Sequence, residues 1–316
     1  MHLPSMIHLS GQRIFLPFYH SVRSEEALPH LQHLYPVRDI ETFQKDLDYL
    51  LDHFKPITLQ SLKEITIKGL KPEENYMHLS FDDGLREVHE LVLPILEEKG
   101  IPASIFVNSA FVDNKALFFR FKISLLIERV QQDLPSETQQ KLLIDILGHR
   151  MTTAFTAKTF ADIILDLTYT DIELIDKMAT TLGLDFAAFL EKQRPYMTSN
   201  QIRDAIHRGF TIGGHSVDHP IYKNLTLDEQ LDQTEGSIRF LQENFKIPDK
   251  IFSFPFTDDG VERTFFEIIE ADAIAELTFG CAGLKQEDFP FHLQRFPMET
   301  TMHDANKLVN TEYFYY

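Results

Sequence analysis

Short apolar segments alternate with amphipathic helical segments along most of this 316-residue chain. A short apolar run that ends in turn residues is typical of a buried strand, whereas apolar residues three or four apart indicate a helix. Strands that alternate with helices form a parallel sheet with covered faces, either open or closed into a barrel. The sequence therefore predicts an α/β fold with strands near residues 14–19, 76–81, 103–107, 210–214, 251–254, 277–281 and 293–296.

Residues 115–199 interrupt this alternation with helical spacing and no strand pattern. We expect a helical insertion between the two parts of one barrel, residues 1–114 and 200–316. Function in α/β folds usually lies in such insertions at strand ends, so this one either selects substrate or only packs on the barrel. Its aromatic and basic run, residues 118–122, suits a phosphorylated or lipid-linked sugar, or else anchors the insertion through its phenylalanines.

The composition excludes several classes of partner. The formal net charge is −18, from 48 acidic and 30 basic residues, so the chain would repel a nucleic-acid backbone or an anionic bilayer. No apolar run approaches the roughly 18 residues of a transmembrane segment. The single cysteine, Cys281, allows no intramolecular disulfide. These features lead us to expect a cytoplasmic protein.

Two adjacent carboxylates, Asp82 and Asp83, follow the apolar segment that ends at Phe81. Neighbouring carboxylates repel unless a cation or a proton lies between them. One can bind a metal while the other accepts a proton from water. A second pair, Asp258 and Asp259, ends another predicted strand in the same way, and the residues alone leave the choice open.

Two histidines, His215 and His219, lie four residues apart, after a Gly-Gly strand end and before Pro220. Two imidazoles and one carboxylate form an incomplete shell for a divalent metal, which leaves positions for water and substrate. The sequence contains no G-x-S-x-G, H-E-x-x-H or Walker motif, which removes the main alternatives. The residues therefore indicate a metal-dependent hydrolase.

Together, Phe81-Asp82-Asp83-Gly84 and His215-Ser216-x-x-His219-Pro220 resemble the polysaccharide deacetylases with a NodB homology domain, carbohydrate esterase family four. The runs at residues 18–22 and 43–58 are also similar to members of this family. The resemblance covers roughly residues 14–112 and 200–300, without the insertion. It implies a distorted (β/α) barrel, a site at the carboxyl ends of the strands, and removal of acetyl groups from N-acetylated sugars.

The resemblance also implies a role for each motif residue. Asp82 would be the catalytic base, and Asp83, His215 and His219 would hold the metal, for which Zn²⁺ is our first choice. The substrate would be an N-acetylated carbohydrate, and a lipid-linked form of it is one alternative.

The chain departs from the family pattern in two motifs. Where the third motif commonly reads Arg-x-Pro-Tyr, this chain has Ser253-Phe254-Pro255-Phe256. We expect Pro255 and Phe256 to line the substrate groove, and Arg295 to supply the missing guanidinium from another strand. The last motif, Leu-x-His, is matched best by Thr301-Met302-His303, which makes His303 the predicted general acid.

Other functions remain consistent with these residues. The same metal site could act on an O-acetyl ester or a non-sugar amide, or the barrel could bind glycans without turnover. The missing third-motif arginine favours the binding protein, whereas the intact acids and histidines oppose it. The aromatic C-terminal run, residues 313–316, either packs on the body or a partner subunit, or stacks on sugar in a chain that has no tryptophan.

Overall fold

The computed structural model describes residues 2–25 and 27–316, so Met1 and Glu26, which fall in the predicted first part of the barrel, lie outside the described residues. Its contacts divide the chain into two compact units. The first contains residues 2–25, 37–113 and 195–316, and the second contains residues 27–36 and 114–194. Each unit is described by itself below.

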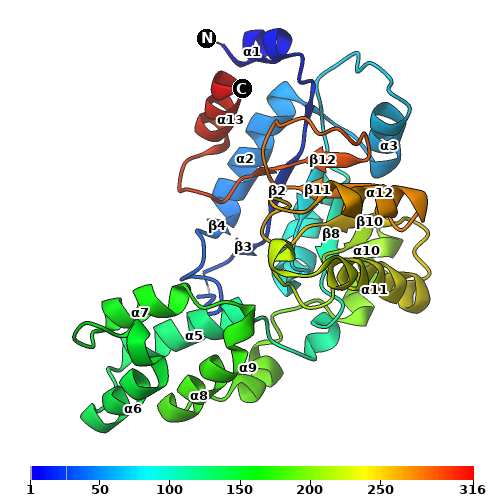
Figure 1. The fold of residues 1–316 in the computed structure, drawn as a ribbon. Coiled ribbons are helices and arrows are strands. Elements are labelled where there is room, and N and C mark those ends of the chain that lie inside the picture. The colour runs from blue at the N-terminus through cyan, green and yellow to red at the C-terminus, as the bar shows by residue number, and fades with distance from the viewer. Residues whose placement is uncertain (1, 26) are drawn as a thin grey trace. The chain divides into compact units, whose positions relative to one another are not determined.

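An eight-stranded sheet forms the centre of the first unit (Figure 1). Its order is β12-β11-β10-β9-β8-β7-β2-β13, and every neighbouring pair is parallel. The strands are β2 (Pro17–Tyr19), β7 (Leu79–Phe81), β8 (Ala103–Val107), β9 (Thr211–Gly214), β10 (Ile251–Ser253), β11 (Leu277–Gly280), β12 (His292–Gln294) and β13 (Phe296–Pro297).

The two edges of this sheet belong to one continuous stretch of chain. β12 pairs with β11 through Thr278 and His292, whereas β13 pairs with β2 through Phe296 and Pro17. Only Arg295 separates the two strands. The stretch therefore joins both edges of the sheet and nearly closes it, which confirms the predicted distorted (β/α) barrel.

Two predicted strands are each interrupted by one residue. Residues 14–19 form β1 (Ile14–Phe15) and β2, and residues 76–81 form β6 (Tyr76–Met77) and β7. β1 and β6 pair with β5 (Lys55–Pro56) in a small parallel sheet, and β3 (Val22–Arg23) pairs with β4 (Arg38–Asp39).

His78, at the second interruption, is buried and its ring bonds the Ile57 carbonyl and Ser104 Oγ, both at 2.8 Å. His78 is therefore an interior, hydrogen-bonded residue.

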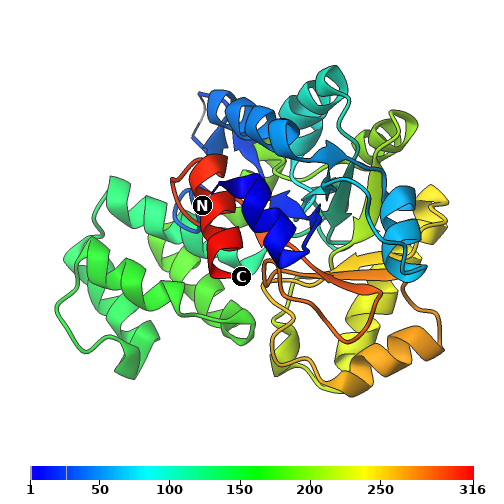
Figure 2. The same cartoon turned by 90° about the horizontal axis from the view of Figure 1, so that it is seen from above.

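Helices surround the strands when the first unit is viewed from above (Figure 2). α1 and α13 lie side by side in both views. The helices are α1 (Leu3–Ser10), α2 (Ile40–His53), α3 (Leu59–Ile67), α4 (Leu93–Lys99), α10 (Ser199–His207), α11 (Leu227–Phe245), α12 (Arg263–Ala271) and α13 (Ala305–Tyr315).

Local sequence signals set the ends of two of these helices. Thr226 and Glu229 form a capping box at the start of α11, because the Thr226 N–H donates to Glu229 Oε2 at 2.8 Å and the Glu229 N–H donates back to Thr226 Oγ1. α4 ends before Gly100, whose φ of 66° lies in the left-handed region.

Aromatic side chains fill much of the core on one side of the barrel. Phe252, Phe254, Phe265 and Phe279 are all buried there, and the Tyr222 ring lies 5.1 Å from that of Phe254. Each buried large apolar side chain contributes about 1.5–3 kcal/mol relative to exposure. The core therefore gives β10 and β11 a rigid support for the residues that follow them.

The second unit is helical, as the periodicity predicts. The rings of Phe118, Phe119 and Phe121 are buried in it, the Arg120 guanidinium donates to the Leu165 carbonyl at 2.5 Å, and Lys122 pairs with Asp176 at 2.8 Å. These contacts favour the packing role of this run over a phosphate-binding role. Its helices are α5 (Phe119–Gln132), α6 (Glu137–Leu147), α7 (Ala157–Leu165), α8 (Ile172–Leu182) and α9 (Phe186–Gln193).

Residues 27–36 also belong to the second unit, although the sequence shows them only as a loop. The buried His30 ring lies 5.1 Å from Phe121 and 5.6 Å from Phe189, and Ser124 Oγ donates to the Pro29 carbonyl at 2.6 Å.

Among the described residues, no helix combines the length and apolarity that crossing a membrane requires.

Candidate active site

The acid pair lies at the carboxyl end of β7, where the chain turns sharply. Asp83 has a φ of 68° and Gly84 a φ of 59°. A Cβ atom on Gly84 would lie 2.6 Å from Cγ1 of Val107, so a larger residue cannot occupy this position without a backbone shift. The turn directs both Asp82 and Asp83 into the protein, where they are buried.

The two histidines follow β9, two strands away from β7 in the sheet. His215 comes directly after the strand, and the chain then makes a tight turn in which the His219 N–H donates to Ser216 Oγ at 2.9 Å. Ser216 and His219 both have positive φ angles, of 67° and 66°. Both imidazoles are buried, and their ring centroids lie 4.9 Å apart.

Asp83, His215 and His219 bring three ligand atoms within 4.8 Å of one another. Asp83 Oδ1 lies 3.2 Å from His219 Nε2 and 3.5 Å from His215 Nε2, and within the described part of the chain it has no hydrogen-bond partner. The His215 Nδ1–H donates to the Ser253 carbonyl at 2.8 Å, which leaves the lone pair of Nε2 toward Asp83. A buried cluster of acceptor atoms of this kind fits a divalent cation.

The electrostatics of the site agree with this interpretation. Burial lowers the pKa of His215 to about 4, so its ring is neutral at physiological pH, as a metal ligand must be. Burial raises the pKa of Asp83, but the neighbouring His219, His20 and His215 outweigh burial and hold that pKa well below its usual range. Asp83 is therefore ionised.

Asp82 is held by Arg295 through two parallel hydrogen bonds. Arg295 Nη1 donates to Asp82 Oδ1 at 2.7 Å, and Nη2 donates to Oδ2 at 2.8 Å. Burial raises the pKa of Asp82, but the charge and the hydrogen bonds of Arg295 outweigh burial, so the pKa is lowered. Asp82 Oδ2 also lies 4.0 Å from His215 Nε2, beside the three ligand atoms.

Arg295 is fully buried at the point where the barrel nearly closes. Its guanidinium also donates to Ser80 Oγ at 3.0 Å and to Ser253 Oγ at 2.5 Å, and it lies 4.3 Å from the centre of the Phe18 ring. Ser253 occupies the first position of the run that replaces the arginine motif. The structure thus places a guanidinium from the β12–β13 junction beside the aspartate.

His20 is a further titratable group whose pKa the aspartates affect, and it was not among the site residues predicted from the sequence. Its Nδ1 lies 2.8 Å from Glu299 Oε2, and its N–H donates to the same oxygen at 2.7 Å. Burial lowers the pKa of His20, but the hydrogen bond and charge of Glu299 and the charges of Asp83 and Asp82 outweigh it and raise the pKa to about 9. The sequence signals were its position directly after an apolar strand and its place in the run 18–22, which resembles members of the family.

The second acid pair lies elsewhere, although Asp258, Glu287 and His292 also bring ligand atoms within 4.8 Å of one another. There the Gln294 Nε2–H₂ donates to Asp258 Oδ2 at 2.6 Å and to Glu287 Oε1 at 2.8 Å, while His292 Nε2 lies 3.0 Å from Asp258 Oδ2. Burial raises the pKa of Asp258, but His292 and Gln294 outweigh it and lower it to about 2. An amide therefore satisfies this cluster in place of a cation.

The predicted groove residues lie on the loop after β10. Phe256 is 40% exposed and its ring lies 4.6 Å from that of His219, whereas Pro255 is buried. Asp258 anchors the same loop to β12 through His292 and Gln294. The loop thus presents an exposed aromatic ring next to a metal-ligand candidate.

His303, the predicted general acid, is exposed in the segment between β13 and α13. Its N–H donates to Thr301 Oγ1 at 3.2 Å, and its carbonyl accepts from Arg38 Nη2. These hydrogen bonds do not connect it to Asp82 or Asp83, so its role at the reacting centre stays a prediction.

Comparison with known proteins decides the family. The family model described as polysaccharide deacetylase matches residues 69–147 and 159–271, which include both the acid pair and the two histidines. The chain belongs to the polysaccharide deacetylase family. The matched ranges exclude His20, Arg295, Glu299 and His303.

Several solved structures share the fold of this family member at low identity. The deacetylase PplD of Streptococcus pyogenes, in complex with acetate, has a TM-score of 0.58 at 13% identity, covering 95% of this chain and 97% of its own. IcaB from Ammonifex degensii has a TM-score of 0.58 at 15% identity, covering 94% and 95%. The de-N-acetylase from Aggregatibacter actinomycetemcomitans has a TM-score of 0.54 at 14% identity, covering 93% and 98%. A search of curated proteins found no match.

Proposed function

We propose that this family member is a metal-dependent hydrolase that removes acetyl groups from N-acetylated sugars. One observation carries the proposal: the buried cluster of Asp83, His215 and His219 lies directly beside Asp82, which Arg295 fixes in its ionised form. The family model supports the reaction class, because it spans all four motif residues. A glycan-binding barrel without turnover would have no need for an aspartate fixed in this way.

Asp83, His215 and His219 would hold the cation, and two imidazoles with one carboxylate favour Zn²⁺. When bound, this cation would polarise the acetyl carbonyl and lower the pKa of a water molecule. The His215–Ser253 hydrogen bond fixes the ring orientation that binding requires.

Asp82 acts as the general base, which takes a proton from the attacking water. Its two oxygens are held by the Arg295 fork, so its position and its charge are both set before substrate arrives. A positioned base of this kind contributes roughly 10²–10⁴-fold to the rate.

Release of the sugar amine requires a proton donor, and His20 is the better placed candidate. Glu299 keeps the imidazole protonated near neutral pH and fixes its orientation, and His20 lies close enough to the aspartates for their charges to raise its pKa. In this scheme water adds its oxygen to the acetyl carbon, the C–N bond breaks, and the nitrogen receives a proton from His20. His303 is the second candidate, retained from the sequence motif.

The test is acetate release from an N-acetylglucosamine oligomer, with metal content measured on the same samples. We expect activity that a chelator abolishes and that zinc restores. An O-acetylated sugar and a simple aryl amide, assayed in parallel, separate the esterase and amidase alternatives. Binding of the oligomer without acetate release by the zinc-loaded protein would instead indicate the non-catalytic barrel.

A further inference from the structure

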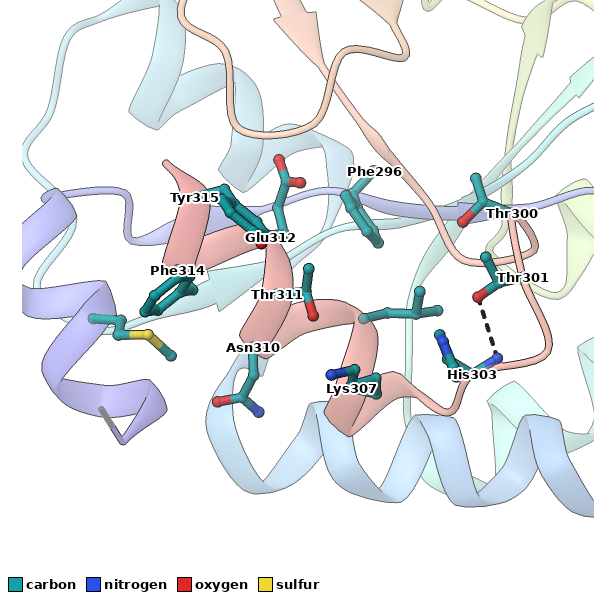
Figure 3. Close-up of a pocket in the computed structure, with 12 residues that line it drawn as sticks. Phe296, Thr300, Thr301, His303, Lys307, Asn310, Thr311, Glu312, Phe314 and Tyr315 are labelled. Atoms are coloured by element: carbon teal, nitrogen blue, oxygen red, sulfur yellow. Dashed lines mark hydrogen bonds between the residues drawn. The ribbon is translucent and has the colours of Figure 1, made fainter.

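A hollow of about 650 Å³ lies between α13 and the segment that leads to it from β13 (Figure 3). Figure 3 shows Phe296, Thr300 and Thr301 on one side, with Glu312 and Tyr315 on α13 opposite. Ligand pockets commonly measure about 300–1,000 Å³, so the hollow has the size of a binding site. Its lining includes His303, the second candidate for the proton donor, but neither the cation cluster nor Asp82, Arg295 and His20.

The chemistry of the lining combines rings with short polar groups. The Tyr315 side chain is 81% exposed and the ring of Phe296 is partly exposed, while Thr300 and Thr301 place exposed hydroxyl groups nearby. A sugar ring has an apolar face of C–H groups and a rim of hydroxyl groups. Aromatic rings beside hydroxyl groups match both features, and the chain has no tryptophan that could serve as a stacking platform instead.

One wall of the hollow is fixed by a buried ion pair. Arg38 pairs with Asp46 at 3.2 Å, and both side chains are almost fully buried. Arg38 donates to the carbonyls of Met298 and His303, and Asp46 accepts from the Ala305 N–H at 2.7 Å. Arg38 and Asp46 therefore hold both ends of the segment 298–305 by hydrogen bonds. These bonds restrict the conformation of the segment, which forms one wall of the hollow.

The same segment reaches the candidate active site. Glu299, which holds His20, is followed directly by Thr300 and Thr301, which line the hollow. The residue that bonds His20, the proposed proton donor, is therefore one or two positions away in the sequence from residues that line the hollow.

We propose that this hollow is a subsite for distal sugar units of an N-acetylated polysaccharide, a proposal that rests on the deacetylase function. A long chain would engage the reacting centre and the hollow together, and the second contact would benefit from a high effective concentration. A disaccharide would engage only the reacting centre. The subsite thus selects for polymer length and places His303 among the groups beside the bound glycan.

The test compares a hexasaccharide and a disaccharide of N-acetylglucosamine on the zinc-loaded 316-residue protein. Tyr315→Ala should raise KM for the hexasaccharide by roughly 3- to 10-fold, the range expected for loss of one ring contact, and leave KM for the disaccharide unchanged. Tyr315→Phe should keep the wild-type KM because it retains the ring. Met302→Ala is the matched control, since Met302 is 76% exposed in the same segment and does not line the hollow.

Direct binding separates failure of the subsite from failure of the proposed reaction. The Asp82→Asn variant, with and without Tyr315→Ala, is titrated with the hexasaccharide by calorimetry. Weaker binding in the double variant supports the subsite even if wild-type protein releases no acetate, in which case only the proposed reaction fails. Equal affinity in both variants, or no binding to either, overturns the subsite.

Discussion

Replacing Arg295 with methionine should both destabilise the barrel and disable the base. Arg295 and Asp82 are 1% and 4% exposed at their side chains, and their two hydrogen bonds measure 2.7 and 2.8 Å. Methionine has a similar shape but leaves the carboxylate buried without its partner. Removal of one partner from a buried ion pair costs about 3–5 kcal/mol, and we expect that loss in the free energy of unfolding at pH 7.

The pH dependence of this loss follows from the sign of the pKa shift. The folded protein lowers the pKa of Asp82, so the interaction contributes stability above the unfolded pKa and loses it as the pH falls through the folded value. In Arg295→Met, burial remains and the main opposing charge is gone, so the pKa of Asp82 rises. The stability difference between wild type and variant should therefore shrink as the pH falls below the unfolded pKa, and the acid limb of kcat/KM should move to higher pH.

Urea unfolding of metal-free protein, followed by circular dichroism because the chain has no tryptophan, measures the first effect. Arg239→Met is the control, because Arg239 lies on the surface, 60% exposed, at 3.6 Å from Glu235, and should change the free energy by less than about 1 kcal/mol. A double-mutant cycle with Asp82→Asn isolates the coupling. The reasoning would be refuted if the two substitutions changed the free energy of unfolding additively and the acid limb of kcat/KM did not move in Arg295→Met.

Three further predictions concern the remaining site residues. Asp83→Ala and His215→Ala should each lose bound metal and nearly all activity; stoichiometric metal in both, by elemental analysis, would contradict the ligand assignment. Activity should fall as the pH rises through the pKa of His20, and Glu299→Gln should move this fall to lower pH because Glu299 raises that pKa; a basic limb that stays in place would argue for His303 as the donor. Asp258→Asn should raise KM several-fold and leave kcat and metal content unchanged, because it loosens the loop that carries Phe256. Steady-state kinetics and metal analysis test this, and a loss of both kcat and bound metal would instead indicate that Asp258 binds a second catalytic cation.

The predicted elements and the observed ones agree best where local signals are strong. The strand before Asp82 and the Gly-Gly strand end before His215 are short-range patterns, and both were predicted at their observed places. The helical unit was predicted from its periodicity, but residues 27–36 carry no periodic pattern that would assign them to it. Their inclusion depends on tertiary packing around His30.

Long-range pairings could not be predicted in the same way. His20 and Glu299 are 279 residues apart, and they meet only because β13 pairs with β2 in the barrel. Likewise, the two acid pairs look alike in sequence, and their partners separate them. His292 and Gln294 bond Asp258, whereas Arg295 bonds Asp82 and two histidines lie beside Asp83. Arg295 was proposed because the third motif lacks its usual arginine. Its contact with Asp82 depends on the register with which β12 pairs with β11 and β13 pairs with β2.

The stretch formed by β12, Arg295 and β13 has a consequence for the nascent protein. A chain still emerging from the ribosome, or one cleaved before residue 292, already contains every residue of the cation cluster but lacks the guanidinium. Asp82 of such a fragment would lack both hydrogen bonds from Arg295. Hydrolysis would therefore require the stretch that joins the two edges of the sheet in addition to the cation cluster.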